Sequence, residues 1–181
     1  MARKESITKD DILAAAFEIL KEEGIAQVTA RKLAAKASCS TQPIFRVYSS
    51  MEKLVEDLFD QACGFFEDFY TGLPRVTVTP FANLGQAYIK FAVEHKKIFE
   101  FIFLSPERYG RSMYDLINGR RGNVSREIQV ATAQGCRNAS ELFMKMWIFI
   151  HGAACMSLTG DYDLSEEDTL RMLKDAYQSF R

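Results

Sequence analysis

Helical periodicity runs through almost the whole chain. Apolar residues recur at three- and four-residue spacing, for example over 12–20 and 54–69, and polar or capping residues separate these stretches. That spacing places apolar side chains on one face of a helix. We find no convincing strand alternation and no internal repeat. The sequence therefore predicts an all-α fold, and its 48% hydrophobic residues can supply a core without metals or disulfides.

Capping residues and helix breakers divide the chain into segments. Helix starts are predicted at Thr8, Thr29, Ser40, Ser49-Ser50, Thr79-Pro80, Asn138 and Ser165. Helix ends are predicted at Gly24, Gly72-Leu73-Pro74 and Ser105-Pro106, with a further helix over 96–104. Four glycines weaken the pattern over 109–137, where we expect one or two helices.

Composition excludes several classes of protein. The first residues run into polar helical sequence, which predicts no secretory signal, and no apolar run is long enough for a membrane span. No two of the four cysteines form a CxxC pair, which argues against a structural zinc site or a disulfide framework. They are Cys39, Cys63, Cys136 and Cys155. Two histidines without paired carboxylates, a nucleophile motif or a phosphate loop predict no enzyme. We expect a cytoplasmic protein without cofactor or membrane partner.

The window 24–54 has the layout of a helix-turn-helix DNA reader: two short helices joined at Ser38-Cys39, between longer helices on either side. In this motif the second short helix enters the major groove. Thr41, Gln42 and Arg46 near its start are candidates for base edges, since Gln pairs well with adenine and Arg with guanine. Phosphates would be held by the hydroxyls of Thr29, Ser40 and Tyr48 and by the charges of Lys53 and the Arg3-Lys4 arm. The candidate DNA-binding residues are Thr29, Ala30, Arg31, Ser40, Thr41, Gln42, Phe45, Arg46, Tyr48 and Lys53.

This window resembles the N-terminal domain of the TetR/AcrR family of bacterial transcription regulators. The framework positions match without a gap at Gly24, Thr29, Leu33, Ala34, Ala37, Ser40, Ile44, Tyr48, Glu52 and Leu54. Four positions depart from the family pattern: Ser38 replaces the turn Gly, Phe45 a Tyr, Val47 a His and Met51 a Lys. The last three positions commonly contact phosphate in the family. The resemblance therefore implies weaker binding to the DNA phosphate backbone unless Lys53, Arg46 or the N-terminal arm compensates.

The C-terminal part, at Trp147-Ile148-Phe149-Ile150-His151-Gly152, resembles the W-x-x-x-H-G subgroup of TetR-type ligand-binding domains. The resemblance implies a DNA-binding domain over 1–53 and a helical ligand-binding and dimerisation domain over 54–181, joined by a long fourth helix. The apolar helix after residue 140 and the stripe of the last helix could form a four-helix bundle across a twofold axis. We expect a homodimer with Ile150, Ala154, Leu158, Leu170, Leu173 and Tyr177 at its interface.

A small-molecule effector site is implied by the resemblance, and aromatic and Met residues between helices are its candidates. They are Phe91, Phe99, Phe103, Tyr109, Met113, Met144, Trp147 and His151. The hypothesis is a repressor that holds a palindromic operator and is released when an effector of unknown identity shifts the fourth helix. Two alternatives remain: a redox-responsive regulator sensing through Cys39 or Cys136, or a helical interaction protein that has lost DNA binding.

Overall fold

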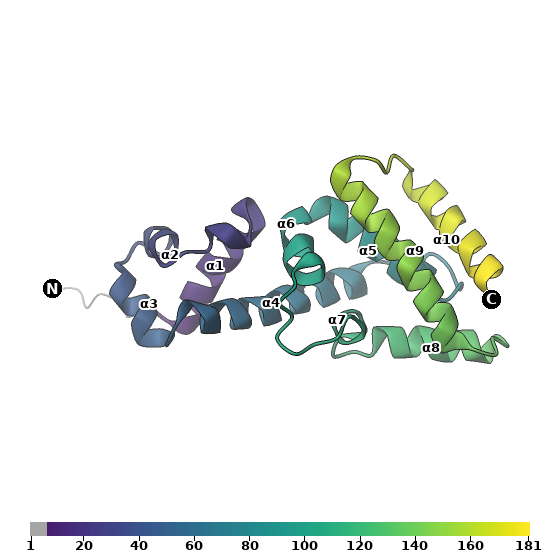
Figure 1. Ribbon diagram of the computed structural model, residues 1–181, viewed down its shortest axis with the longest axis horizontal. Helices are drawn as coiled ribbons and strands as arrows, with labels where there is room; N and C mark the ends of the chain where they lie inside the picture. Colours follow the sequence, from purple (N-terminus) through teal and green to yellow (C-terminus); the bar gives the residue numbers. More distant parts are fainter. Residues whose placement is uncertain (1–6) are drawn as a thin grey trace. The chain divides into compact units, whose positions relative to one another are not determined.

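The computed structural model describes residues 7–181, and all the regular secondary structure in this part of the chain is helical (Figure 1). The elements are α1 (Lys9–Glu23), η1 (Ile25–Gln27), α2 (Ala30–Lys36), α3 (Thr41–Val47), α4 (Met51–Gly72), α5 (Ala82–Glu94), α6 (Lys96–Phe99), η2 (Glu100–Leu104), α7 (Met113–Asn118), α8 (Asn123–Ala133), α9 (Ala139–Thr159) and α10 (Glu166–Phe180). The predicted all-α fold is confirmed. The segment 109–137, where we expected one or two helices, contains two, α7 and α8.

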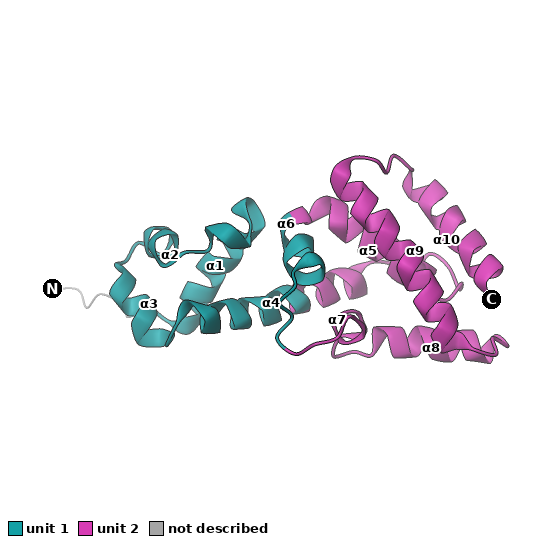
Figure 2. Cartoon of the chain, in the orientation of Figure 1, with its two compact units in different colours: residues 1–63, 97–109 teal, residues 64–96, 110–181 magenta. Residues whose placement is uncertain are grey.

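The chain forms two compact units (Figure 2). The first comprises the described residues up to Cys63 together with Lys97–Tyr109, and the second comprises Gly64–Lys96 together with Gly110–Arg181. Helix α4 contributes residues to both units. This division falls inside α4, after the boundary at residue 53 that we predicted from the sequence.

Side-chain caps explain where several helices begin. The Thr8 hydroxyl accepts from the Asp11 backbone N–H at 3.1 Å, and the Asp11 carboxylate accepts from the Thr8 N–H at 2.9 Å. Asn138 and Ser165 cap α9 and α10 in a similar way through the backbone N–H three residues on. Each cap satisfies a donor that a helix start would otherwise leave unpaired. These sequence-predicted starts are therefore confirmed.

The first unit has a continuous apolar core. Its buried side chains include Ile12, Ala16, Ile19, Leu20, Leu33, Ile44, Leu54, Leu58 and Phe59. The ring of Phe59 meets that of Phe101 edge-on at 5.4 Å between centroids. Helices α1, α2 and α3 and the start of α4 thus share one core, which gives α3 a rigid base.

The second unit is centred on α5, which packs against α9 and α10. The close approach depends on Gly85: a Cβ there would lie 2.8 Å from Cδ1 of Ile150 and 3.0 Å from Cδ2 of Leu173. Tyr88 and Phe91 of the same helix are fully buried. Burial of this apolar surface is the main favourable contribution to folding of the unit.

Within residues 7–181, one helix, α9, is long and apolar enough to cross a membrane by length and composition, with a mean hydropathy of 1.3. In this structure α9 packs against α5, α8 and α10 of its own unit. A helix that is apolar on most sides is also typical of the centre of a soluble domain.

A buried carboxylate fastens α8 to the beginning of α5. Glu127 is fully buried, accepts a hydrogen bond from the Phe81 backbone N–H at 2.8 Å, and forms an ion pair with Arg75 at 2.9 Å. Phe81 has a left-handed backbone with φ of +62°, which an L-residue adopts only when its surroundings favour it. The Glu127 contact therefore helps to hold the turn that starts α5 two residues later than we predicted at Thr79-Pro80.

Candidate nucleic-acid interface and effector region

The short helices α2 and α3 are joined by a tight turn. The Thr29 hydroxyl caps α2 by accepting from the Lys32 backbone N–H at 3.3 Å. At the turn the Cys39 N–H donates to the Ala34 carbonyl at 2.9 Å, and Ser38 has a left-handed φ of +51°. That conformation favours glycine, which explains why the TetR pattern has Gly at this position.

The inner faces of both helices are buried and their outer faces are not. Leu33 and Ile44 are fully buried. On the outer side of α3, the exposed side chains are Thr41, Gln42, Phe45 and Arg46. Phe45 is 50% exposed, an unusual position for a large aromatic side chain. The structure thus brings the predicted base-contacting residues together on one accessible helix face.

Ion pairs neutralise several basic residues of the reader. Lys32 pairs with Glu23, and Lys36 pairs with Glu22 at 2.9 Å. The predicted phosphate contact Lys53 also pairs, with Glu56 at 2.7 Å. In this structure a neighbouring carboxylate compensates the positive charge that each of these lysines would present to DNA.

Two exposed arginines differ from these lysines. Arg31 on α2 and Arg46 on α3 have no carboxylate partner within residues 7–181. They are the cations of α2 and α3 that are available to phosphates or bases. The Arg3-Lys4 arm, which we also predicted to hold phosphate, lies outside the described residues.

The predicted phosphate contact of Tyr48 does not fit its position. Its side chain is only 3% exposed, and its hydroxyl is buried. Burial and the nearby Asp57 carboxylate raise the pKa of Tyr48 to about 12, so the hydroxyl stays protonated. The aromatic ring is part of the base on which α3 packs, and reaching phosphate would require it to leave the core. Thr29 and Ser40 remain exposed, and Ala30 is half-buried.

Four of the six predicted dimer-interface residues are buried within the single chain. Ile150, Ala154, Leu173 and Tyr177 are each at most 2% exposed, while Leu158 and Leu170 are half-buried. Their periodicity correctly indicated an apolar face, but α5 of the same chain covers that face. The buried four cannot form an intersubunit surface without unfolding.

A different face of α9 and α10 is open. It carries a groove of about 450 Å³ between the two helices and the loop that joins them. Ile148 is 66% exposed, Met156 48% and Leu164 41%. The full lining is Ile148, Phe149, Gly152, Ala153, Met156, Asp161, Tyr162, Asp163, Leu164 and Met172. An exposed apolar surface of this kind is typical of a protein-protein contact.

The predicted effector residues fall into separate clusters. Phe99 and Phe103 are buried and pack ring to ring at 5.1 Å, and Tyr109 lies against Phe59; all belong to the first unit. The remaining predicted residues belong to the second unit. Of those, Met144 is 53% exposed rather than in an interior site.

In the second unit, an aromatic and polar cluster surrounds His151. Its Nδ1 lies 3.0 Å from the Tyr88 hydroxyl, and its ring stacks on Trp147 at 5.4 Å. Phe91 is fully buried in contact with Phe66, and Met113 is half-buried. The contacts of His151 and Phe91 are those of packed core residues, and neither residue lines the groove between α9 and α10.

Comparison with known families agrees with this arrangement of helices. The family model described as bacterial regulatory proteins, tetR family, matches residues 12–58, and that of the tetracyclin repressor-like C-terminal domain matches residues 81–179. The chain belongs to the TetR family. TetR-family regulators bind DNA, dimerise and bind small-molecule effectors. The first of the two matches covers α2 and α3, so this chain has the family's helix-turn-helix.

Solved structures of other TetR regulators share the fold. A TetR-family transcriptional regulator from Rhodococcus sp. is 17% identical with a TM-score of 0.66, covering 95% of this chain and 97% of that one. A TetR-family regulator from Vibrio parahaemolyticus is 18% identical with a TM-score of 0.65, covering 94% and 96%. A TetR transcription regulator from Haloarcula marismortui is 19% identical with a TM-score of 0.59, covering 95% of each chain. No curated protein matches this chain.

Proposed function

We propose that this TetR-family protein is a repressor that binds a palindromic operator as a homodimer and is released by a small-molecule effector. The observation that carries this proposal is the exposed face of α3, where Gln42 and Arg46 stand on a rigid, buried base. Neither residue is needed for the core. A bidentate Gln selects adenine and a bidentate Arg selects guanine, each by about 1–3 kcal/mol.

Phe45 adds an apolar contact to the same face. Its half-exposed ring cannot donate to phosphate as the Tyr of the family pattern would. An aromatic ring in the major groove can instead pack against a thymine methyl group. The operator half-site would therefore contain at least one thymine next to the bases that Gln42 and Arg46 read.

The open groove of α9 and α10 is the proposed dimer interface, in place of the buried residues expected from the sequence. Ile148, Met156 and Leu164 supply its apolar surface. A twofold contact there would bury the same patch on both chains. Two readers on one dimer would then meet two half-sites about one helical turn of DNA apart.

Effector release would act through α4, since this helix contributes residues to both compact units. If an effector changes the position of its C-terminal part, the start of the helix that supports α3 changes with it. Effector and operator would then weaken each other's binding by the same factor. The site of action is DNA, which implies the cytoplasm, and no cofactor is needed.

Binding of the protein to DNA from upstream of its own gene tests this proposal. Fluorescence anisotropy with a labelled duplex would compare the parent with Gln42→Ala and Arg46→Ala. As a matched control, Arg137→Ala removes an exposed arginine from the other unit. We expect each reader variant to lose roughly tenfold or more in affinity while the control is unchanged. If all variants bind like the parent, α3 does not read DNA.

The loss would also depend on sequence. A variant that loses a base contact should discriminate less at one base pair, whereas loss of a phosphate contact weakens all sequences alike. Duplexes with single base changes therefore distinguish the two roles of Arg46.

A further inference from the structure

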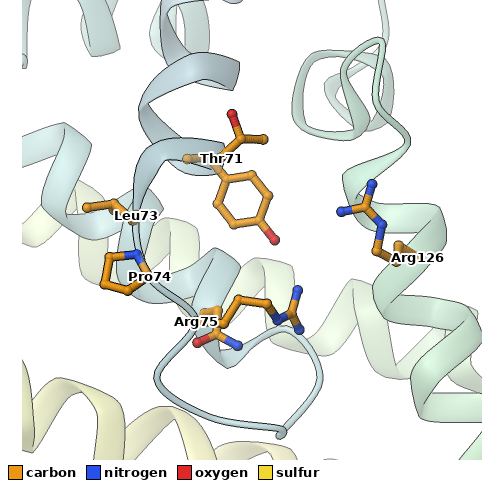
Figure 3. Close-up of a pocket in the computed structure, with 7 residues that line it drawn as sticks. Thr71, Leu73, Pro74, Arg75 and Arg126 are labelled. Carbon is orange, nitrogen blue, oxygen red and sulfur yellow. The ribbon is translucent and has the colours of Figure 1, made fainter.

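A small cavity lies in the second unit at the end of α4, away from the aromatic residues that the sequence singled out (Figure 3). Its volume is about 130 Å³. The lining comes from the last turn of α4, the loop that follows, the first turn of α5, and α8. The lining residues are Tyr70, Thr71, Leu73, Pro74, Arg75, Asn83 and Arg126.

Two guanidinium groups point into the same space from opposite sides, one from Arg75 and one from Arg126 (Figure 3). Arg75 is held by the fully buried Glu127 at 2.9 Å, so its charge is compensated and its position fixed. The guanidinium of Arg126 donates to the Arg121 backbone carbonyl at 3.0 Å and has no carboxylate partner within residues 7–181. The cavity wall therefore carries one uncompensated positive charge.

The other polar groups of the wall are fixed as well. Tyr70 is 7% exposed, and burial raises the pKa of its hydroxyl, which thus remains a donor at neutral pH. Asn83 accepts from the backbone N–H groups of Val76 at 2.9 Å and Thr77 at 3.2 Å and donates to the Thr77 carbonyl at 2.7 Å. These bonds hold the loop that carries Arg75. Tyr70, which is buried, and Arg75, which is paired with Glu127, are in place before any ligand arrives, whereas Arg126 is exposed. Donors that are already in place lower the entropy lost on binding.

We propose that this cavity binds a compact oxyanion, a carboxylate or a phosphate group, with Arg126 as its main anchor. The volume corresponds to roughly four water molecules at about 30 Å³ each, which suits an oxyanion of a few heavy atoms. The planar guanidinium of Arg126 can donate two parallel bonds to such a group. Arg75 and Tyr70 complete the set of donors on the facing wall.

The position of the cavity gives the anion a route to regulation, and this part of the inference rests on the proposed function. Tyr70 and Thr71 belong to the last turn of α4, whereas Arg126 belongs to α8. The turn that precedes α8 is already bonded to α4, because Arg121 bonds to Thr71, to Asp68 and, through its backbone N–H, to Glu67. An anion bound between Arg126 and Tyr70 would tighten that connection and so bias the end of α4. The bound group would be the acidic end of the effector.

Isothermal titration of the full-length protein with acetate, propionate and inorganic phosphate tests the site, at constant ionic strength set with chloride. Arg126→Gln removes the anchor, and Tyr70→Phe removes one donor without removing a ring. Arg120→Gln is the matched control, since Arg120 is an exposed arginine outside the lining. We expect one saturable site per chain, weakened roughly tenfold or more by Arg126→Gln and unchanged in the control.

The outcome also assigns the ligand class. Saturable binding of acetate or propionate alone indicates a carboxylic acid, and binding of phosphate alone indicates a phosphate-bearing compound. No saturable binding of any of the three, or equal binding by the parent and Arg126→Gln, would overturn the proposal. Thermal melts of each variant show whether a lost signal reflects unfolding, and Tyr70→Phe then supplies an independent test.

Operator affinity measured in the same buffers separates this inference from the proposed function. Failure of the parent to bind DNA without anion counts against the proposed function and leaves the titration result standing. If DNA and anion both bind but neither changes the affinity for the other, the anion is not an effector and the regulatory part of the inference is wrong.

Discussion

The ion pairs between α1 and α2 lead to a gain-of-function prediction. Lys32 and Lys36 are held by Glu23 and Glu22, two carboxylates at the C-terminal end of α1. Replacing both with Gln (Glu22→Gln, Glu23→Gln) leaves the two lysines without partners. The stability cost should be small, because exposed ion pairs contribute little and acidic groups are unfavourable at a helix C-terminus.

The expected effect on DNA binding follows from the number of cations released. Within residues 7–181, Arg31 and Arg46 of the parent have no carboxylate partner. Each phosphate contact contributes about −0.9 to the slope of log affinity against log salt concentration. Freeing Lys32 and Lys36 adds up to two contacts per reader, so the slope of a dimer would steepen by up to about 3.6. Each added contact would make affinity fall about 3.5-fold more between 50 and 200 mM salt.

The assay is fluorescence anisotropy with one operator duplex at four or five salt concentrations. The chain supplies a matched control: Glu141→Gln with Glu166→Gln removes the same two charges, and it also breaks ion pairs, with Lys145 and Lys90. Those carboxylates belong to the other unit. The prediction is wrong if the Glu22→Gln, Glu23→Gln variant keeps the parental slope of log affinity against log salt concentration, or if the control steepens that slope equally. The ion pairs of Lys32 and Lys36 would then not limit the affinity for DNA.

Three further substitutions test the fold and the assembly. Ser38→Gly should raise the free energy of unfolding by about 0.5–1 kcal/mol, because the left-handed turn at φ of +51° favours glycine, and an unchanged melting temperature would contradict this. Gly85→Ala should cost about 1–3 kcal/mol by overpacking, since its Cβ would lie 2.8 Å from a side-chain carbon, whereas Gly64→Ala in α4 meets nothing within 4 Å and should not destabilise. Ile148→Glu should convert a dimer to a monomer in analytical ultracentrifugation. Met144→Glu introduces the same charge outside the groove and should leave the dimer intact. If the Ile148→Glu protein stays dimeric, the groove is not the dimer interface.

The parts of the fold that the sequence predicted well depend on local interactions. Capping at Thr8, Thr29, Asn138 and Ser165 involves a side chain and a backbone group three residues away, so a short window contains all the information. The capping box of Ser112 and Asp115 at α7 has the same form, and the glycines around it hid the signal.

The errors arose where the partner of an apolar face is distant in sequence. The stripe of Ile150, Ala154, Leu173 and Tyr177 indicates burial, but periodicity cannot tell whether α5 or a second chain covers it. The chain's own helix comes close because Gly85 leaves room for Ile150. Tyr48 was likewise predicted from its hydroxyl, although its ring is the part that the core uses.

The cavity at the end of α4 could not be found from the sequence for a related reason. Arg75 lies between the predicted helix end at Gly72-Leu73-Pro74 and the predicted helix start at Thr79-Pro80, and Arg126 lies in the segment 109–137, where glycines weaken the periodicity. Their approach depends on Glu127, a buried carboxylate that binds Arg75 and the backbone of Phe81. Glu127 lies on an amphipathic helix, and nothing in the sequence around it indicates that its side chain will be buried.

Of the two cysteines proposed as redox sensors, Cys136 does not fit that role. Cys136 is only 6% exposed, so an oxidant has little access to its thiol. Cys39, at the turn between α2 and α3, is half-buried. Oxidant-insensitive operator binding, identical in the parent and Cys39→Ser, would argue against the remaining candidate.

The central claim is that a dimer of this chain reads a palindrome through α3, and hydroxyl-radical footprinting on its own upstream DNA tests it most directly. We predict two protected half-sites related by a twofold axis and about 10–10.5 base pairs apart, and loss of both protections in Arg46→Ala. A single protected half-site, or a footprint that Arg46→Ala leaves intact, would contradict the claim.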